Sequence, residues 1–223
     1  MAEIKSSYPL SLSIDYPENL DRLTTFLRIL WIIPIAVILA LLVGSFSSYT
    51  ATSHTGFWGY RPALNIERGW RVELNFGLVF LPLVLMLLFR QKYPRWWFDW
   101  NLSLLRFSTR VEAYFGLLRD EYPSTDEEQA VHLDIAYPDA QKDLNRWLPL
   151  VKWFLAIPHY FLLAFLGIAV AVCLVVAWFA ILFTGRYPRG LFDFVVGYMR
   201  WWLRVLAYAF MLVTDRYPPF SLD

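Results

Sequence analysis

The sequence has a single cysteine, Cys173, among 223 residues. One thiol excludes an intramolecular disulfide and any metal or redox site that needs a pair of cysteines. Cys173 stands in the apolar run AVCLVVA, where a buried and unreactive thiol is the expected state. The motifs HExxH, GxSxG, GxGxxG and the P-loop are missing as well. We therefore predict that the chain is not an enzyme and holds no cofactor and no metal.

Net charge is nearly absent too, since 20 Lys and Arg oppose 19 Asp and Glu to give +1. The chain thus lacks the basic field that nucleic acid attracts, and no nucleic acid partner is expected. The first 25 residues are polar and lack the apolar core of a signal peptide, so no cleavable signal is expected there. What is abundant is apolar surface: 58% of the residues are hydrophobic and 11 are Trp. That composition predicts a membrane protein.

Two nine-residue stretches are nearly the same, KYPRWWFDW at 92–100 and RYPRGLFDF at 186–194. Other residues match in the same order: Tyr16-Pro17 with Tyr137-Pro138, Ile33-Pro34 with Ile157-Pro158, Arg106 with Arg200, Arg110 with Arg204, Tyr114 with Tyr208, and Asp120 with Asp215. We interpret the chain as two copies of one unit, 1–123 and 124–223. The first copy carries an insertion at 45–73.

The apolar runs predict an all-α membrane protein with four transmembrane helices, arranged as two parallel-repeat hairpins. The predicted spans lie near 26–44 and 74–90 in copy one, and near 149–166 and 168–185 in copy two. Gly167 is the expected break in copy two, because that apolar run is about twice the ~20 residues that cross a bilayer. Only three of the 20 Lys and Arg fall in 45–73. The positive-inside rule therefore places both termini in the cytoplasm.

Residues 95–117 and 189–212 predict amphipathic helices that lie in the cytoplasmic interface of the membrane. Each has a narrow polar stripe: Arg95, Asp99, Arg106 and Arg110 in the first, and Arg189, Asp193, Arg200 and Arg204 in the second. The first Arg and the Asp of each stripe are four residues apart, so an ion pair within the helix is expected. The stripes are candidate contacts for a partner or for anionic lipid.

Two six-residue segments alternate apolar and polar residues, 10–15 and 131–136. A period of two predicts small cytoplasmic β-strands, which we expect to lie on the interfacial helices. The tail Pro219–Leu222 is a possible third strand.

The insertion 45–73 contains the aromatic residues Phe57, Trp58, Tyr60 and Trp70 beside Arg61. Aromatics with arginine are typical of a protein–protein interface, which makes this outer loop a candidate partner contact. The alternative is an anchor lying on the lipid headgroups. His159, inside an apolar run, is predicted to form a hydrogen bond between helices, and a ligand or proton role is the less favoured alternative.

The segments LFTGRYPRGLFDFVVGYMRWWLRVLAYAFMLVTDRYPPFSL and WLPLVKWFLAIPHY resemble the bacterial domain of unknown function 4389. The resemblance is specific over about 131–222 and looser in the first copy, where Ile35 stands in place of His159. It implies a bacterial membrane protein, and it implies no activity. Together with the predicted spans, it predicts a multi-pass protein of the bacterial plasma (inner) membrane.

These observations predict a non-catalytic accessory or scaffold subunit of a larger membrane protein complex. Its expected partners are membrane lipids and other membrane protein subunits. Two alternatives remain open: a lipid-interacting membrane protein, and a component of a transporter or channel.

Overall fold

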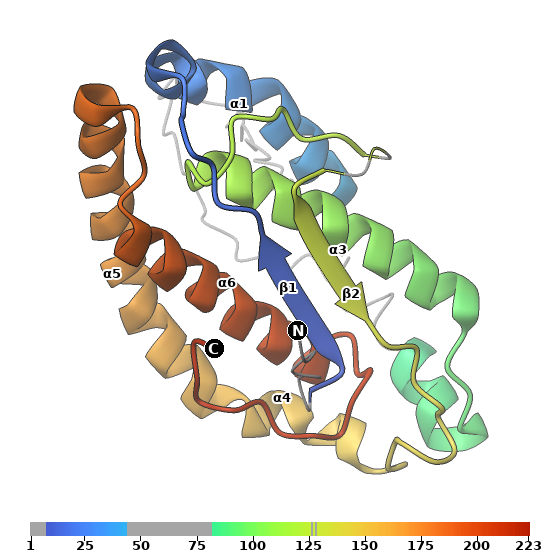
Figure 1. The fold of residues 1–223 in the computed structure, drawn as a ribbon. Coiled ribbons are helices and arrows are strands. Elements are labelled where there is room, and N and C mark those ends of the chain that lie inside the picture. Colours follow the sequence, from blue (N-terminus) through green and yellow to red (C-terminus); the bar gives the residue numbers. More distant parts are fainter. Residues whose placement is uncertain (1–7, 44–81, 126, 128) are drawn as a thin grey trace, which may run out of the picture.

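The computed structural model describes residues 8–43, 82–125, 127 and 129–223 (Figure 1). In chain order the elements are β1 (Leu10–Ile14), α1 (Arg22–Val43), the short π-helix η1 (Met86–Arg90), α3 (Arg95–Phe115), β2 (Val131–Ile135), the 3₁₀ turn η2 (Leu148–Leu150), α4 (Lys152–Leu155), α5 (Ile157–Thr184) and α6 (Arg189–Ala209). The outer-loop residues Phe57, Trp58, Tyr60, Arg61 and Trp70 lie outside the described residues.

The strands β1 and β2 pair antiparallel, with Leu12 opposite Leu133 and Leu10 opposite Ile135. In both strands every second side chain is buried, which confirms the two strands predicted from the alternation. The third strand expected at Pro219–Leu222 does not form. Backbone carbonyls of that tail instead accept hydrogen bonds from arginines of α6.

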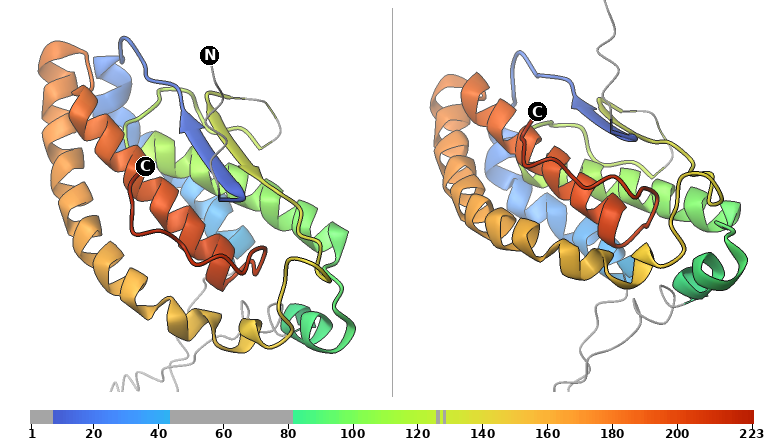
Figure 2. Two further views of the ribbon diagram at one scale, coloured as in Figure 1. Left: turned by 60° about the horizontal axis from the view of Figure 1, so that its bottom comes forward. Right: turned by 90° about the horizontal axis from the view of Figure 1, so that it is seen from below.

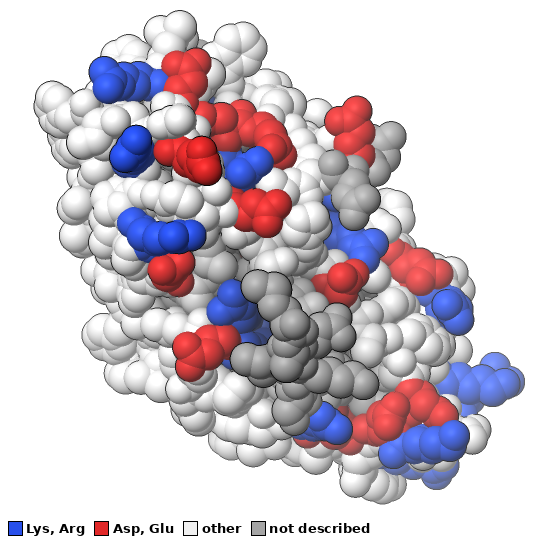
Figure 3. Space-filling model, viewed as in Figure 1, with Lys and Arg blue, Asp and Glu red and all other residues white. Residues whose placement is uncertain are grey.

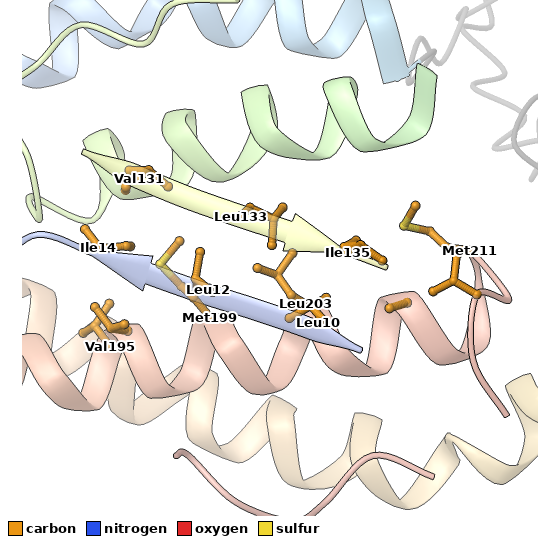
Figure 4. Packing of buried hydrophobic residues seen from close by; sticks show 14 of the residues in the cluster. Leu10, Leu12, Ile14, Val131, Leu133, Ile135, Val195, Met199, Leu203 and Met211 are labelled. Atoms are coloured by element: carbon orange, nitrogen blue, oxygen red, sulfur yellow. The ribbon is translucent and has the colours of Figure 1, made fainter. Parts of the chain in front are cut away.

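The sheet covers one side of two long helices, since β1 packs on α6 and β2 packs on α3. The buried strand residues point toward α6 residues such as Met199 and Leu203 (Figure 4). On the other side, α1 packs against α3 and α5 packs against α6. Seen edge-on, the strands and α1 lie on opposite sides of the α3–α6 pair (right-hand view of Figure 2). A polar sheet layer and an apolar helical layer thus enclose the core.

Both predicted amphipathic helices are present, and each begins directly after a Tyr-Pro pair. Pro94 and Pro188 hold extended backbone at the N-caps of α3 and α6, because proline disfavours helical geometry in its predecessor but starts a helix well. The interfacial placement of these two helices in a membrane stays a prediction.

The predicted architecture of four transmembrane helices in two hairpins is wrong. Within the described residues, α5 is the one helix that is by itself long and apolar enough to cross a bilayer. The helix α1 qualifies as a second only if its two parts, which meet at a 53° bend after Arg28, count as one span. The predicted span 74–90 is described only from residue 82, and that part is a short helical stretch ending at Gln91.

The two spans predicted at 149–166 and 168–185 are replaced by one continuous helix, α5, preceded by the short elements η2 and α4. Gly167 does not break α5, because one glycine inside a helix costs only about 1 kcal/mol and no proline follows it. A side chain there would stand 3.2 Å from the Tyr198 hydroxyl, so the glycine serves the packing of α5 on α6. The predicted break at Gly167 is therefore wrong, because this glycine lies inside a continuous helix and packs against α6.

Candidate functional site

The arginines at the centre of the two predicted stripes point at the sheet. The Arg106 Nε donates a hydrogen bond to the Leu133 carbonyl at 2.9 Å, and the Arg200 Nε donates to the Leu12 carbonyl at 3.3 Å. Arg106 also forms an ion pair with Asp134 at 2.8 Å. These two arginines therefore clamp each strand onto its helix.

The next arginine of each stripe holds the chain that follows. Arg110 donates to the Ser124 carbonyl at 2.9 Å, and Arg204 donates to the carbonyls of Ser221 and Asp223. Burial lowers the pKa of Arg204 from its usual value. A contact of these groups with lipid or a partner stays a prediction, and each such contact competes with a bond inside the chain.

The first arginine of each stripe stacks on a tyrosine from the other half of the chain. The guanidinium of Arg95 lies 5.1 Å from the centre of the Tyr137 ring, and that of Arg189 lies 4.7 Å from the Tyr16 ring. The expected ion pairs with Asp99 and Asp193 do not form. A cation over an aromatic face competes with an exposed i,i+4 ion pair, which is worth little.

The same two tyrosines tie the halves together through their hydroxyls. Tyr16 donates a hydrogen bond to the Tyr187 carbonyl, and Tyr137 donates one to the Tyr93 carbonyl, both at 2.5 Å. Each bond joins a strand segment of one half to the Tyr-Pro segment before the helix of the other half.

Two buried cations, which the sequence patterns did not single out, lie under the ends of α3 and α6. The Lys152 ammonium is fully buried, 2.7 Å from the Asp215 carboxylate, and donates to the Thr214 carbonyl at 2.7 Å. Desolvation lowers the pKa of Lys152, while the hydrogen bond and charge of Asp215 act to raise it. Arg28 is placed alike, paired with Asp120. The match of Asp120 with Asp215 in the sequence could have indicated these two buried ion pairs.

His159 is fully buried between α5 and α6. Its Nδ1 accepts a hydrogen bond from the Trp201 indole N–H at 3.0 Å, as the sequence predicted for a polar residue between helices. Its ring stacks on Phe220 of the C-terminal tail at 4.1 Å. Within the part of the chain that the structure describes, no cluster of metal-ligating side chains is present.

The outer side of α1, α4 and α5 is apolar and exposed, and we call it the apolar face. Its exposed side chains include Phe26, Leu30, Trp31 and Ile33 of α1, Trp153 and Phe154 of α4, and Phe161, Phe165, Ile168, Val172, Val175, Phe179 and Phe183 of α5. Only 17% of the most hydrophobic stretch of α5 is buried, so α5 is not the core helix of the described fold. Many Lys, Arg, Asp and Glu side chains are visible on the sheet side (Figure 3). So large an apolar patch marks a membrane or protein contact.

Glu112 on α3 has an exposed side chain, but the surrounding protein desolvates its carboxyl. This desolvation raises the pKa of Glu112 from 4.5 to about 7. The folded state therefore binds this proton more tightly than the unfolded state, and stability is lost as the pH rises from about 4.5 through 7.

We expect Glu112→Gln to raise the unfolding temperature at pH 8 and to leave it nearly unchanged at pH 4.5, because the amide removes the cost of an ionised, desolvated carboxylate. Thermal unfolding of the detergent-solubilised protein across this pH range measures the effect. The matched control is Glu18→Gln, at an exposed residue. An unfolding temperature that shifts equally at both pH values would contradict the assignment.

Residues 147–221 match the model of a family described as "Domain of unknown function (DUF4389)", which confirms the resemblance for this segment. The matched segment is less than half of the chain and runs from η2 to the C-terminal tail. One copy is matched, and the second tandem copy predicted in 1–123 is not. The comparison with curated proteins finds no match. The comparison with solved structures finds none either.

Proposed function

We propose that the chain is a non-catalytic accessory or scaffold subunit, held in the bacterial plasma membrane by its apolar face and packed there on another membrane protein subunit. The observation that carries the proposal is the division of the surface. Exposed apolar side chains occupy α1, α4 and α5. Arginines of α3 and α6 instead donate hydrogen bonds to backbone carbonyls of the same chain. A rigid body with one lipid-compatible face suits assembly more than chemistry.

The proposal places α5 and α1 in the bilayer and the sheet in the cytoplasm. Most Lys and Arg residues belong to segments outside the 45–73 insertion, and many of the described ones are visible on the sheet side (Figure 3). Basic groups stay preferentially on the cytoplasmic side. The described chain begins just before β1, and the C-terminal tail accepts hydrogen bonds from arginines of α6. The same rule therefore puts both termini in the cytoplasm.

We further propose that 1–123 and 124–223 are two copies of one unit. The support is a set of contacts that occurs twice at matching positions: strand carbonyls on Arg106 and Arg200, tyrosine hydroxyls of Tyr16 and Tyr137, and the buried pairs of Arg28 and Lys152. By the same matching, α5 corresponds to the segments on either side of the 45–73 insertion. Because each strand packs on the helix of the other half, neither half completes its core alone.

If the halves are equivalent, Tyr16→Phe and Tyr137→Phe should each lower the free energy of unfolding by a similar amount, about 1 kcal/mol, because each removes one hydrogen bond to a carbonyl. Chemical unfolding of the single variants and the double variant measures the losses. Tyr122→Phe, at an exposed tyrosine, is the control. A loss confined to one of the two sites would contradict the equivalence.

Photo-crosslinking in native membranes tests the proposed function. A photoreactive phenylalanine analogue replaces Phe165 on the apolar face, and Ser13 on the exposed strand face in a control. We expect a discrete protein adduct from position 165 and none from position 13. Adducts with lipid alone at every exposed position of α5 would overturn the scaffold proposal and favour the lipid-interacting alternative.

A further inference from the structure

A cleft of about 420 Å³ lies between α1 and the second half of α5, and the end of α3 closes one side of it. Its lining is almost wholly apolar and includes Ile32 of α1, Phe115 of α3, and Leu174, Val175 and Trp178 of α5. The volume is within the range of ~300–1,000 Å³ typical of ligand sites in proteins. The cleft is open at the surface and its wall belongs to the apolar face. Its chemistry fits a hydrocarbon chain.

Two arginines lie at the start of α1 and just after the end of α5, beyond the residues that line the cleft. Arg22 precedes the lining residue Thr25 by one helical turn, and its Nε is 3.6 Å from the point where a side chain on Gly185 would begin. Arg186 follows that glycine and is exposed. The Leu20 N–H donates to the Gly185 carbonyl at 2.9 Å, so the start of α1 and the end of α5 are held together.

Among the residues that the structure describes, no ion pair includes Arg22 or Arg186, whereas the deeper Arg28 is already neutralised by Asp120. The glycine between the two helix ends adopts a left-handed backbone (φ 72°), which terminates α5 and turns the chain toward Arg186. Two positive charges therefore lie at the ends of the two helices, α1 and α5, that flank the apolar cleft.

We propose that this cleft binds one anionic phospholipid, with an acyl chain between α1 and α5 and the phosphate held by Arg22 and Arg186. The inference rests on the proposed function, which places α1 and α5 in the bilayer. Guanidinium groups pair well with phosphate oxygens. Trp178 lines the cleft, and an indole ring suits the boundary between headgroup and hydrocarbon. The site would fix the protein in the cytoplasmic leaflet, where anionic lipids concentrate.

The test is lipid binding to the full chain in detergent, followed by native mass spectrometry during titration with phosphatidylglycerol or phosphatidylcholine. We expect tighter binding of phosphatidylglycerol. Arg22→Ala and Arg186→Ala should each weaken it by about fivefold, the effect of one arginine near an anionic surface, and should not change phosphatidylcholine binding. Val175→Trp, which fills the cleft, should weaken the binding of both lipids.

The matched control is Arg146→Ala, which removes an exposed arginine from the corresponding position of the second half, where the side chain bonds Gln91 instead. It should leave both affinities unchanged. Equal binding of the two lipids, or phosphatidylglycerol binding unaffected by both arginine variants and by Val175→Trp, would overturn the inference.

Vesicle flotation separates this failure from a failure of the proposed function. A chain that floats with vesicles of either lipid, but without preference for phosphatidylglycerol, contradicts the lipid site alone. A chain that floats with neither contradicts the membrane placement itself. The arginine variants lie at exposed positions and are expected to keep the melting temperature of the parent, so lost binding is not lost folding.

Discussion

Replacing Lys152 with methionine is expected to lower the free energy of unfolding by about 3–5 kcal/mol, the cost of breaking a buried ion pair from one side. The ammonium of Lys152 is fully buried, and its removal leaves the Asp215 Oδ1 and the Thr214 carbonyl without this donor. The Asp215 Oδ2 keeps its bond from the Asn145 N–H. Denaturant unfolding of the purified protein, followed by tryptophan fluorescence, measures the loss.

Two control variants make this prediction specific. The double variant Lys152→Met/Asp215→Asn should recover most of the loss, because the orphaned charge is removed with its partner. Lys142→Met, which breaks an exposed pair with Asp139, should change stability by less than about 0.5 kcal/mol. A double variant as unstable as the single one would show that Lys152 matters through its packing and not its charge.

Placing an arginine at Val172, on the exposed side of α5, should weaken partition into lipid vesicles by about 100-fold. A charged residue in the middle of a membrane helix costs about 2.5–3.5 kcal/mol, which converts to this order of magnitude. The lipid concentration at which half of the protein is bound measures the effect. Val172 is 59% exposed, so the arginine does not disturb the core.

The same arginine at Ser13, on the exposed face of β1, should leave partition unchanged. If α5 instead faces water, Val172→Arg would improve solubility and have no effect on vesicle binding. One outcome is a loss of vesicle binding of about 100-fold and the other is unchanged binding, so this pair of variants discriminates between an apolar face covered by lipid and one that faces water.

The local patterns predicted the strands and the amphipathic helices well, because each pattern depends only on residues that are close together in the sequence. Leu10, Leu12 and Ile14 alternate, and the Tyr-Pro pairs mark the starts of α3 and α6. Hydropathy alone wrongly predicted two spans where α5 is one helix, because the length of an apolar run does not determine whether it forms one helix or two. Gly167, which was predicted as the break, instead packs against Tyr198 of α6, a contact that the sequence does not display.

The candidate site was predicted only in part, for a similar reason. The arginine stripes were correctly found on one face of each helix, but a helical wheel does not say what that face meets. It meets strands from the other half of the chain, through Arg106 and Arg200. The cleft beside α5 was missed because Arg22, Thr25 and Trp178 come together only when α1 packs on α5.

The proposed membrane placement requires that the apolar face contacts lipid acyl chains. Site-directed spin labelling in vesicles measures whether side chains on this face are in the bilayer. In a background lacking Cys173, nitroxides are placed at Ile168 and Phe179 of α5 and at Ser11 and Ser13 of β1. We predict that labels on α5 collide with oxygen, which concentrates in the bilayer, and that labels on β1 collide with a water-soluble nickel chelate. Labels on α5 that respond to the chelate as strongly as those on β1 would contradict the account.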